Sequence, residues 1–143
     1  FFRKLMVGSD MVDLAESSAD PQAISSKGAL GLGQIILTTA TQAGRELAQS
    51  KTHFRYVSKK KLINLTKNDL FDPAVNILLT CYLISKYNFK FDGKIDLVLT
   101  AWNAGENTES LTYGRHAPYR ETEDLIGKVN AYFVFFLKNR IFR

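Results

Sequence analysis

The sequence has a single cysteine, only three prolines and no long apolar run. One cysteine, Cys81, excludes a disulfide within the chain. No stretch reaches the roughly 18 apolar residues that a membrane-spanning helix needs, and the first residues lack the pattern of a signal peptide. Because the chain begins at Phe1 without a methionine, we expect a mature form or a fragment of a longer precursor.

The size and composition are those of one ordinary globular domain, covering residues 1–143. The chain is 45% hydrophobic and 23% charged, with a net charge of +5. The cations gather in two clusters, which we interpret as a solvated loop and a solvated tail, although attraction to nucleic acid, anionic lipid or cell-wall polymer stays open. The first cluster comprises Lys51, Arg55, Lys59, Lys60 and Lys61, and the second Lys138, Arg140 and Arg143.

Helical patterns dominate the first half of the chain, and the predicted fold class is mainly α. Apolar residues from about 5 to 15 predict a helix that ends at Glu16. Residues 17–34 hold a proline and three glycines, too many breakers for a regular element. A helix should follow, capped by Thr38 or Thr39 and ending near residue 48. The polar, basic stretch 49–69 predicts a loop with short helical pieces at most.

The second half begins with a clear helix start at Asp72-Pro73, an N-cap carboxylate followed by a proline in the first turn. Apolar residues on nearly every side predict a buried helix to about Tyr87, with Cys81 as a buried thiol. Further helices are expected over 95–102 and 121–138, separated by a polar, aromatic loop. Val129 and residues 132–137 of the last helix, several of them aromatic, are expected to supply much of the core volume.

Glu16 is the main candidate for chemistry. It stands where an apolar segment meets a turn, a serine and a glycine-rich loop. Cleavage of a glycosidic bond needs an acid to protonate the leaving oxygen, and usually a second carboxylate. A glutamate that loses solvent at such a junction could stay protonated near neutral pH. Taken alone, however, a glutamate at a helix end is more often a solvated charge.

Four ordered blocks of sequence resemble the lytic transglycosylases, enzymes with a goose-lysozyme-like fold that cut bacterial peptidoglycan. The resemblance covers nearly the whole chain and implies a lysozyme-like (goose-type) helical domain. The blocks are Glu16-Ser17 with Pro21, Ser25, Gly28-Ala29, Gly31-Leu32 and Gln34; Asp72-Pro73 with Asn76 and Tyr82; Ala101-Trp102-Asn103-Ala104-Gly105; and Pro118-Tyr119-Arg120-Glu121-Thr122 with Val129 and Ala131-Tyr132.

Carried over residue by residue, the resemblance implies that Glu16 is the sole catalytic acid and base. Ser25 and Gln34 would hydrogen-bond the sugar near its N-acetyl group, and Gly28 and Gly31 would let the loop backbone approach the glycan. The implied substrate-binding set is Ser17, Ser25, Gly31, Gln34, Ile36, Trp102 and Asn103, with Glu121 and Tyr119 in support.

Each implied role has a structural alternative. Ser25 and Gln34 could satisfy backbone groups of their own loop, and Trp102 could belong to the core. Glu121 could be a first-turn carboxylate favoured by the helix dipole. His53 and His116 have no metal-like spacing and are expected at the surface.

No matched second carboxylate accompanies Glu16, although Asp10, Asp13 and Asp20 are near in sequence. Substrate-assisted glycosidases need no protein nucleophile. In the reaction that the resemblance implies, the N-acetyl carbonyl of MurNAc stabilises the developing cation. Glu16 protonates the departing GlcNAc O4 and then deprotonates the MurNAc C6 hydroxyl, which closes a 1,6-anhydro ring.

The sequence departs from the family pattern around the expected cleft. Ala19, Gly33 and Leu37 replace a bulky residue, a methionine and a proline, while Trp102 replaces a tyrosine and so lacks its hydroxyl. Glu106-Asn107 stands where Pro-Gly is usual. These changes leave Glu16 intact but bear on the shape of the cleft.

The resemblance implies peptidoglycan strands as partner, a monomer, no cofactor, no metal and a periplasmic or cell-envelope location. Nucleic acid is not expected as a partner, because no recognition motif accompanies the basic residues. Two alternatives stay open: a goose-type hydrolase of peptidoglycan or chitin, and a non-catalytic glycan-binding module on the same scaffold.

Overall fold

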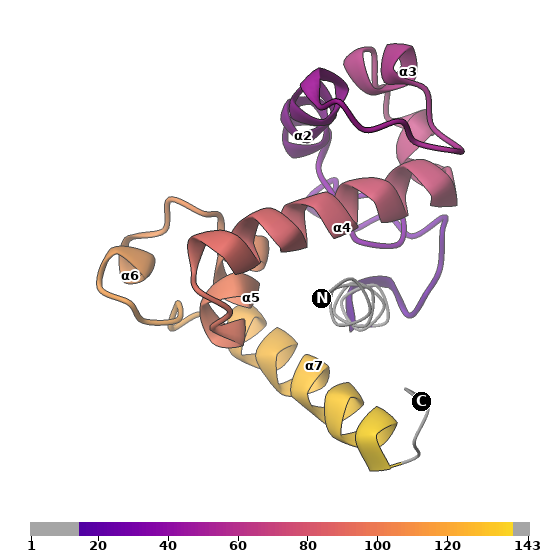
Figure 1. Ribbon diagram of the computed structural model, residues 1–143. Helices are drawn as coiled ribbons and strands as arrows, with labels where there is room; N and C mark the ends of the chain where they lie inside the picture. Colours follow the sequence, from indigo (N-terminus) through magenta and orange to yellow (C-terminus); the bar gives the residue numbers. More distant parts are fainter. Residues whose placement is uncertain (1–14, 139–143) are drawn as a thin grey trace. The chain divides into compact units, whose positions relative to one another are not determined.

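The computed structural model describes residues 15–138 and is mainly helical, as predicted (Figure 1). Most of the predicted first helix, including Asp10 and Asp13, lies outside the described residues, as do Arg140 and Arg143. Within residues 15–138, no helix is both long and apolar enough to cross a membrane. The described chain divides into two compact units that meet between Leu83 and Ile84. Whether residues 1–143 act as one catalytic domain stays a prediction.

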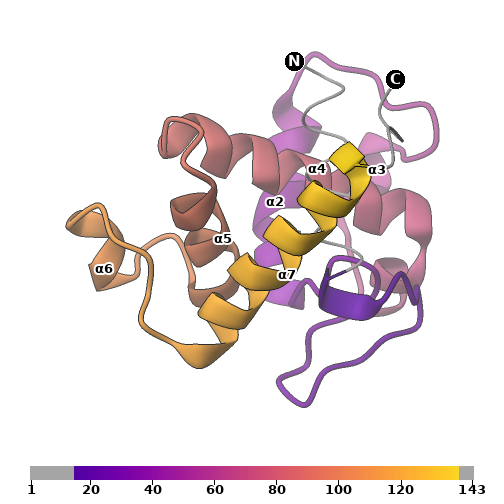
Figure 2. The ribbon, with the colours of Figure 1, turned by 90° about the horizontal axis from the view of Figure 1, so that it is seen from below.

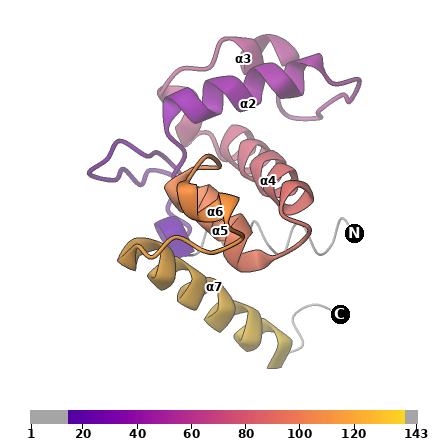
Figure 3. The same cartoon turned by 90° about the vertical axis from the view of Figure 1, so that its left-hand side faces the viewer.

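The first unit begins with a helical turn at 15–17, followed by an irregular loop that Figure 2 shows leading into helix α2. Helix α2 (Leu37–Gln49) lies beside the short helix α3 (Lys59–Ile63) in both Figure 1 and Figure 3. Their close approach depends on Gly44, because a β-carbon there would lie 2.4 Å from the carbonyl oxygen of Leu62.

The predicted cap of helix α2 is wrong. Ile36, with an extended backbone, is the N-cap residue and makes no side-chain cap bond. The helix begins at Leu37, so Thr38 and Thr39 already lie in its first turn. The threonine that does bond to the helix backbone is Thr41, whose hydroxyl donates to the Leu37 carbonyl oxygen at 2.8 Å.

Helix α4 (Pro73–Lys90) begins as predicted: the Asp72 carboxylate accepts a hydrogen bond from the Ala74 N–H at 2.9 Å. The helix runs to Lys90, beyond the predicted end at Tyr87. Just before it, a 3₁₀ turn, η1 (Asn68–Phe71), completes the short helical pieces expected in the polar stretch. Cys81 is half-buried rather than buried, and the exposed positions of α4 include Ile77 and Phe89.

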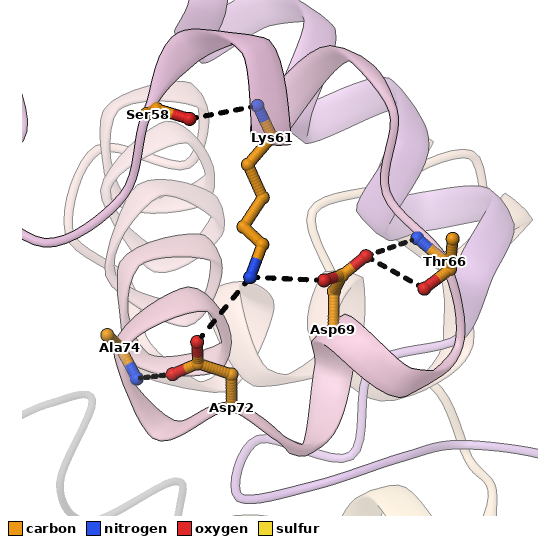
Figure 4. Close-up of polar contacts among 6 residues, drawn as sticks. All are labelled: Ser58, Lys61, Thr66, Asp69, Asp72 and Ala74. Carbon is orange, nitrogen blue, oxygen red and sulfur yellow. Dashed lines mark hydrogen bonds and ion pairs between the residues drawn. The ribbon is translucent and has the colours of Figure 1, made fainter.

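Lys61 connects the segment before α4 to helix α3 (Figure 4). Its Nζ lies 3.2 Å from Asp69 Oδ1 and 3.8 Å from Asp72 Oδ2. Asp69 Oδ2 accepts hydrogen bonds from the backbone N–H and the hydroxyl of Thr66, both at 2.8 Å. Ser58 Oγ caps α3 by accepting from the Lys61 N–H. The Lys61 side chain thus links helix α3 to η1 and to the start of α4.

Two of the other cations of the first cluster contact neighbouring groups. Lys59 Nζ donates to the Ser50 carbonyl oxygen, and Arg55 lies over the ring of Tyr56 at 5.3 Å from the ring centre. Lys51 and Lys60 are exposed. The predicted solvated loop is therefore right for Lys51, Arg55, Lys60 and Lys61, which are exposed, whereas Lys59 is half-buried.

The second unit contains helix α5 (Ile95–Ala104), the short helix α6 (Glu109–Thr112) and helix α7 (Arg120–Lys138). Figure 1 shows α6 within the connection from α5 to α7, a turn that the sequence analysis missed. Helix α5 contacts both other helices. His116, like His53 in the first unit, is exposed as expected.

The prediction that the apolar and aromatic residues of the last helix fill the core is right for Val129 but wrong for Phe133, Val134 and Phe135, while Tyr132 is half-buried. The buried residues of α7 are Thr122, Leu125 and Val129, whereas Phe133, Val134 and Phe135 are 41%, 47% and 55% exposed. Ten residues of α5 span about 15 Å and nineteen of α7 about 28 Å. Because α5 is the shorter helix, it cannot cover the whole length of α7.

Candidate functional site

The predicted site residues fall into two groups, one in each unit. Ser17, Ser25, Gly31, Gln34 and Ile36 belong with Glu16 to the first unit. The second unit holds the other group, made of Trp102, Asn103, Tyr119 and Glu121. Each group is described separately below.

Glu16 is half-buried in the last helical turn before the loop, and Ser17 is the last helical residue. The chain then reverses through two consecutive left-handed residues, Ser18 and Ala19, with φ of 54° and 60°. A hydrogen bond from the Asp20 N–H to the Ser17 carbonyl oxygen, 3.1 Å long, closes this turn. The helix therefore stops directly after Glu16 and Ser17, as the sequence predicted.

The loop after Glu16 is tied together by its own backbone. Ile24 pairs with Leu30, and Leu30 with Ile35, as isolated antiparallel bridges. The Gly31 N–H also donates to the Ala23 carbonyl oxygen at 2.9 Å. Leu30 and Ile35 are buried, so this loop has an apolar anchor and a fixed path even though it is not a regular element.

Ser25 and Gln34 both bond to the backbone of this loop. Ser25 Oγ accepts from the N–H groups of Lys27 and Ala29, at 3.2 and 3.0 Å. Gln34 Nε2 donates to the carbonyl oxygens of Ala23 and Gly31, at 3.2 and 2.8 Å. These bonds use both acceptor positions of the serine hydroxyl and both amide hydrogens of the glutamine. Ser25 can therefore offer a ligand only its hydroxyl hydrogen, and Gln34 only its carbonyl oxygen.

Gly31 is buried, and its position is dictated by packing within the first unit. With φ of +72°, a β-carbon there would lie 2.2 Å from the Leu70 carbonyl oxygen and 2.4 Å from Asn76 Nδ2. Gly28, with φ of +81°, has no atom within 4 Å of a built β-carbon. The lack of a side chain thus has a packing reason at Gly31 and a conformational one at Gly28.

Asn76 also belongs to this group, although no role was predicted for it from the sequence. It is fully buried, and its side-chain amide bonds to Leu30, Gly33 and Leu70. The sequence held one signal for its role: Asn76 is a polar residue in an otherwise apolar helix and lies in the second matched block. Ile36, by contrast, makes no side-chain contribution to this network; it is 43% exposed at the start of α2.

In the second unit, Trp102 and Asn103 lie in the last turn of α5, which ends at Gly105 with φ of +94°. Trp102 is half-buried and Asn103 exposed. Asn103 Nδ2 donates to the hydroxyl of Thr122 at 2.8 Å, and Thr122 is fully buried in the first turn of α7. This bond orients the Asn103 amide. Thr122 is thus a second residue for which no role was predicted from the sequence.

The two supporting residues are both exposed at the start of α7. Tyr119 is 55% exposed, and its carbonyl oxygen accepts the Glu123 N–H at 3.0 Å. Glu121 lies in the first turn of the helix, where a carboxylate is favoured by the helix dipole.

Glu106, one of the departures from the family pattern, has a structural role in the second unit. Its carboxylate lies 2.9 Å from Lys90 Nζ and 3.7 Å from Lys86 Nζ. These ion pairs connect the loop after Asn103 to the end of α4. The acidic residue that departs from the family pattern at this position therefore holds the loop through ion pairs.

Comparison with known proteins bears on the family and the fold of this chain. Residues 11–122 match the family described as the Transglycosylase SLT domain. The fold is similar to that of lytic transglycosylase Slt from Pseudomonas aeruginosa, solved by X-ray crystallography as an inactive glutamate-to-glutamine variant, with a TM-score of 0.67 and 23% identity. The match covers 93% of this chain but only 21% of Slt. Since the family match extends over residues 11–122, most of the sequence, this chain belongs to the SLT transglycosylase family and has its lysozyme-like, mainly α fold.

Proposed function

We propose that this domain cleaves the β-1,4 bond between MurNAc and GlcNAc in peptidoglycan without consuming water, leaving a 1,6-anhydroMurNAc end. The observation that carries the proposal is the loop after Glu16, which belongs to the family match and presents one donor and one acceptor. An N-acetyl group has one carbonyl oxygen and one N–H. The Ser25 hydroxyl and the Gln34 carbonyl oxygen suit these two groups.

Glu16 performs both proton transfers in this reaction. Its carboxyl group donates a proton to O4 of the departing GlcNAc as the bond to C1 of MurNAc breaks. The N-acetyl carbonyl oxygen of MurNAc stabilises the positive charge at C1. The Glu16 carboxylate then takes the proton of the C6 hydroxyl, O6 bonds to C1, and the carboxyl group is regenerated.

Two features favour this role for Glu16. It is half-buried, and a fixed turn ends its helix directly after Ser17, so its backbone is held at the start of the sugar-binding loop. The Slt variant that is described as inactive has a glutamine in place of a glutamate, which fits a reaction that depends on a glutamate carboxyl group.

In the second unit, Asn103 would present its amide oxygen to the glycan while Thr122 holds its nitrogen. Trp102, half-buried beside it, would offer an aromatic surface to a sugar ring. We expect the domain to act as a monomer in the periplasm or cell envelope, where peptidoglycan is found.

Digestion of purified cell walls tests the proposal. The wild type should release fragments whose anhydro ends are one water lighter than reducing ends, as measured by mass spectrometry. Glu16→Gln should lower turnover by at least about 10²–10⁴-fold, the usual contribution of general acid–base catalysis, while keeping fold and wall binding. Asp20→Asn, a matched change in an exposed neighbour, should keep full activity.

The alternatives give different products. Reducing ends would identify a hydrolase, and wall that binds the protein but releases no fragment would identify a glycan-binding module. Either outcome would contradict the proposed reaction, and substantial activity in Glu16→Gln would contradict the role of Glu16.

A further inference from the structure

Asn76 is a buried amide that bonds to three backbone groups outside its own helix, and its Oδ1 also accepts a longer bond from the Thr80 hydroxyl at 3.5 Å. Its Oδ1 accepts from the Gly33 N–H at 2.8 Å. Its Nδ2 donates to the carbonyl oxygens of Leu30 and Leu70, at 3.0 and 2.8 Å. The residue is fully buried, so its side chain cannot touch a glycan. Its role must be exerted through the residues that it holds.

Those residues frame the turn that carries Gln34. The turn runs from Gly31 to Gln34 and is closed by a 3.1 Å hydrogen bond from the Gln34 N–H to the Gly31 carbonyl oxygen. Asn76 bonds to Leu30, directly before the turn, and to Gly33, inside it. The loop can reach the amide only because Gly31 has no β-carbon.

Gln34 needs such support, because its backbone is left-handed with φ of +51°. A residue with a β-carbon adopts this conformation at a cost and keeps it only where the surroundings enforce it. The same backbone conformation aims the Gln34 side chain so that Nε2 reaches the carbonyl oxygens of Ala23 and Gly31. Loss of the Asn76 bonds would release the turn and with it this side chain.

We infer that Asn76 is a positioning residue for sugar binding: it locks the Leu30–Gln34 turn in the conformation in which the Gln34 carbonyl oxygen is aimed at the N-acetyl group. The inference rests on the proposed function for the identity of the ligand. The locking of the turn itself rests on contacts of the described residues alone.

Binding of a GlcNAc tetramer, measured by calorimetry in the Glu16→Gln background, tests the inference. Asn76→Asp keeps the acceptor for Gly33 but loses both donors. We expect it to weaken binding about tenfold, the equivalent of one well-made hydrogen bond. Gln34→Ala should have a similar effect. Because Asn76 acts through Gln34, the double variant should bind no more weakly than either single variant.

The matched control is Leu79→Ala, which removes a fully buried side chain from the same helix that has no polar atom to contribute to the hydrogen bonds of Asn76. Measured well below the unfolding midpoints, it should lose stability but keep the parent affinity. If Asn76→Asp does not fold, Asn76→Gln replaces it, since this change keeps the amide and displaces it by one methylene. Equal losses of affinity in the Asn76 and Leu79 variants, or additive losses in the double variant, would overturn the inference.

A second readout needs no ligand. The Gln34 side-chain amide hydrogens should exchange slowly with solvent in the wild type and in Leu79→Ala, and rapidly in the Asn76 variant, as followed by NMR. If the folded parent binds no tetramer, the proposed sugar contact fails, and the exchange rates still decide whether Asn76 fixes Gln34. Unchanged exchange in the Asn76 variant would overturn the positioning role.

Discussion

Gly31 and Asn76 pack without any spare room between them: a β-carbon on the glycine would lie 2.4 Å from Nδ2 of the asparagine. The two residues are far apart in sequence, in the first and second matched blocks. A side chain at position 31 would therefore require Asn76 and the Leu70 carbonyl group to move.

Gly31→Ala should destabilise the domain more than Gly28→Ala. Both glycines have a positive φ, so alanine costs about 1–2 kcal/mol at either position. Only at Gly31 does the new methyl group also collide with buried atoms, which adds about 1–3 kcal/mol. Urea unfolding of the two variants measures the difference, and equal losses would contradict the packing that we describe.

Thr122→Val should weaken glycan binding, because Asn103 loses the acceptor that orients its amide. The change keeps the shape of the buried side chain, so we expect a loss of about 1 kcal/mol in the free energy of unfolding and a rise in KM of about threefold to tenfold. Thr122→Ser, which restores the hydroxyl, is the control and should keep the wild-type KM. An unchanged KM in the valine variant would argue against a role for the Asn103–Thr122 pair.

Asp69 should make the free energy of unfolding depend on pH. The backbone N–H of Thr66 is the main cause that lowers the pKa of this carboxyl group below its usual value, helped by the Thr66 hydroxyl and by Lys61, while burial opposes the shift. A pKa that is lower in the folded than in the unfolded state stabilises the fold above about pH 4, and this contribution disappears as the pH falls through the folded value.

The comparison of wild type with Asp69→Asn tests this dependence. The wild type should be the more stable protein at pH 7, and its advantage should shrink as the pH is lowered from 4 to 2 in urea titrations. An advantage that stays constant over this range would show that the charge of Asp69 contributes nothing.

Asp72→Ala should cost about 1 kcal/mol, the usual value of an N-cap residue, because the Ala74 N–H loses its acceptor. Asp72→Asn keeps an acceptor but removes the charge that lies 3.8 Å from Lys61. Since Asp72 and Lys61 are both 42% exposed, this pair contributes little, and we expect the asparagine variant to stay close to the wild type. Thermal unfolding of both variants separates the cap from the ion pair.

Much of the helical fold could be predicted because its signals are local. Asp72-Pro73 starts α4 through an N–H only two residues away, and Gly105 ends α5 through its own positive φ. The exact start of a helix after an irregular loop was harder to predict. Ile36, rather than a threonine, precedes α2 because the extended backbone that follows the buried Ile35 decides where the helix begins.

The sequence by itself determined the family, the mainly helical fold and the end of the first helix at Glu16, since capping residues, breakers and motif spacing act over a few positions. Tertiary structure decided the rest. Asn76 bonds to Leu30 across 46 residues and Asn103 to Thr122 across 19, while Phe133 and Phe135 are exposed rather than buried. Such partners and exposures depend on which segments pack together and over what length, and no local pattern encodes that.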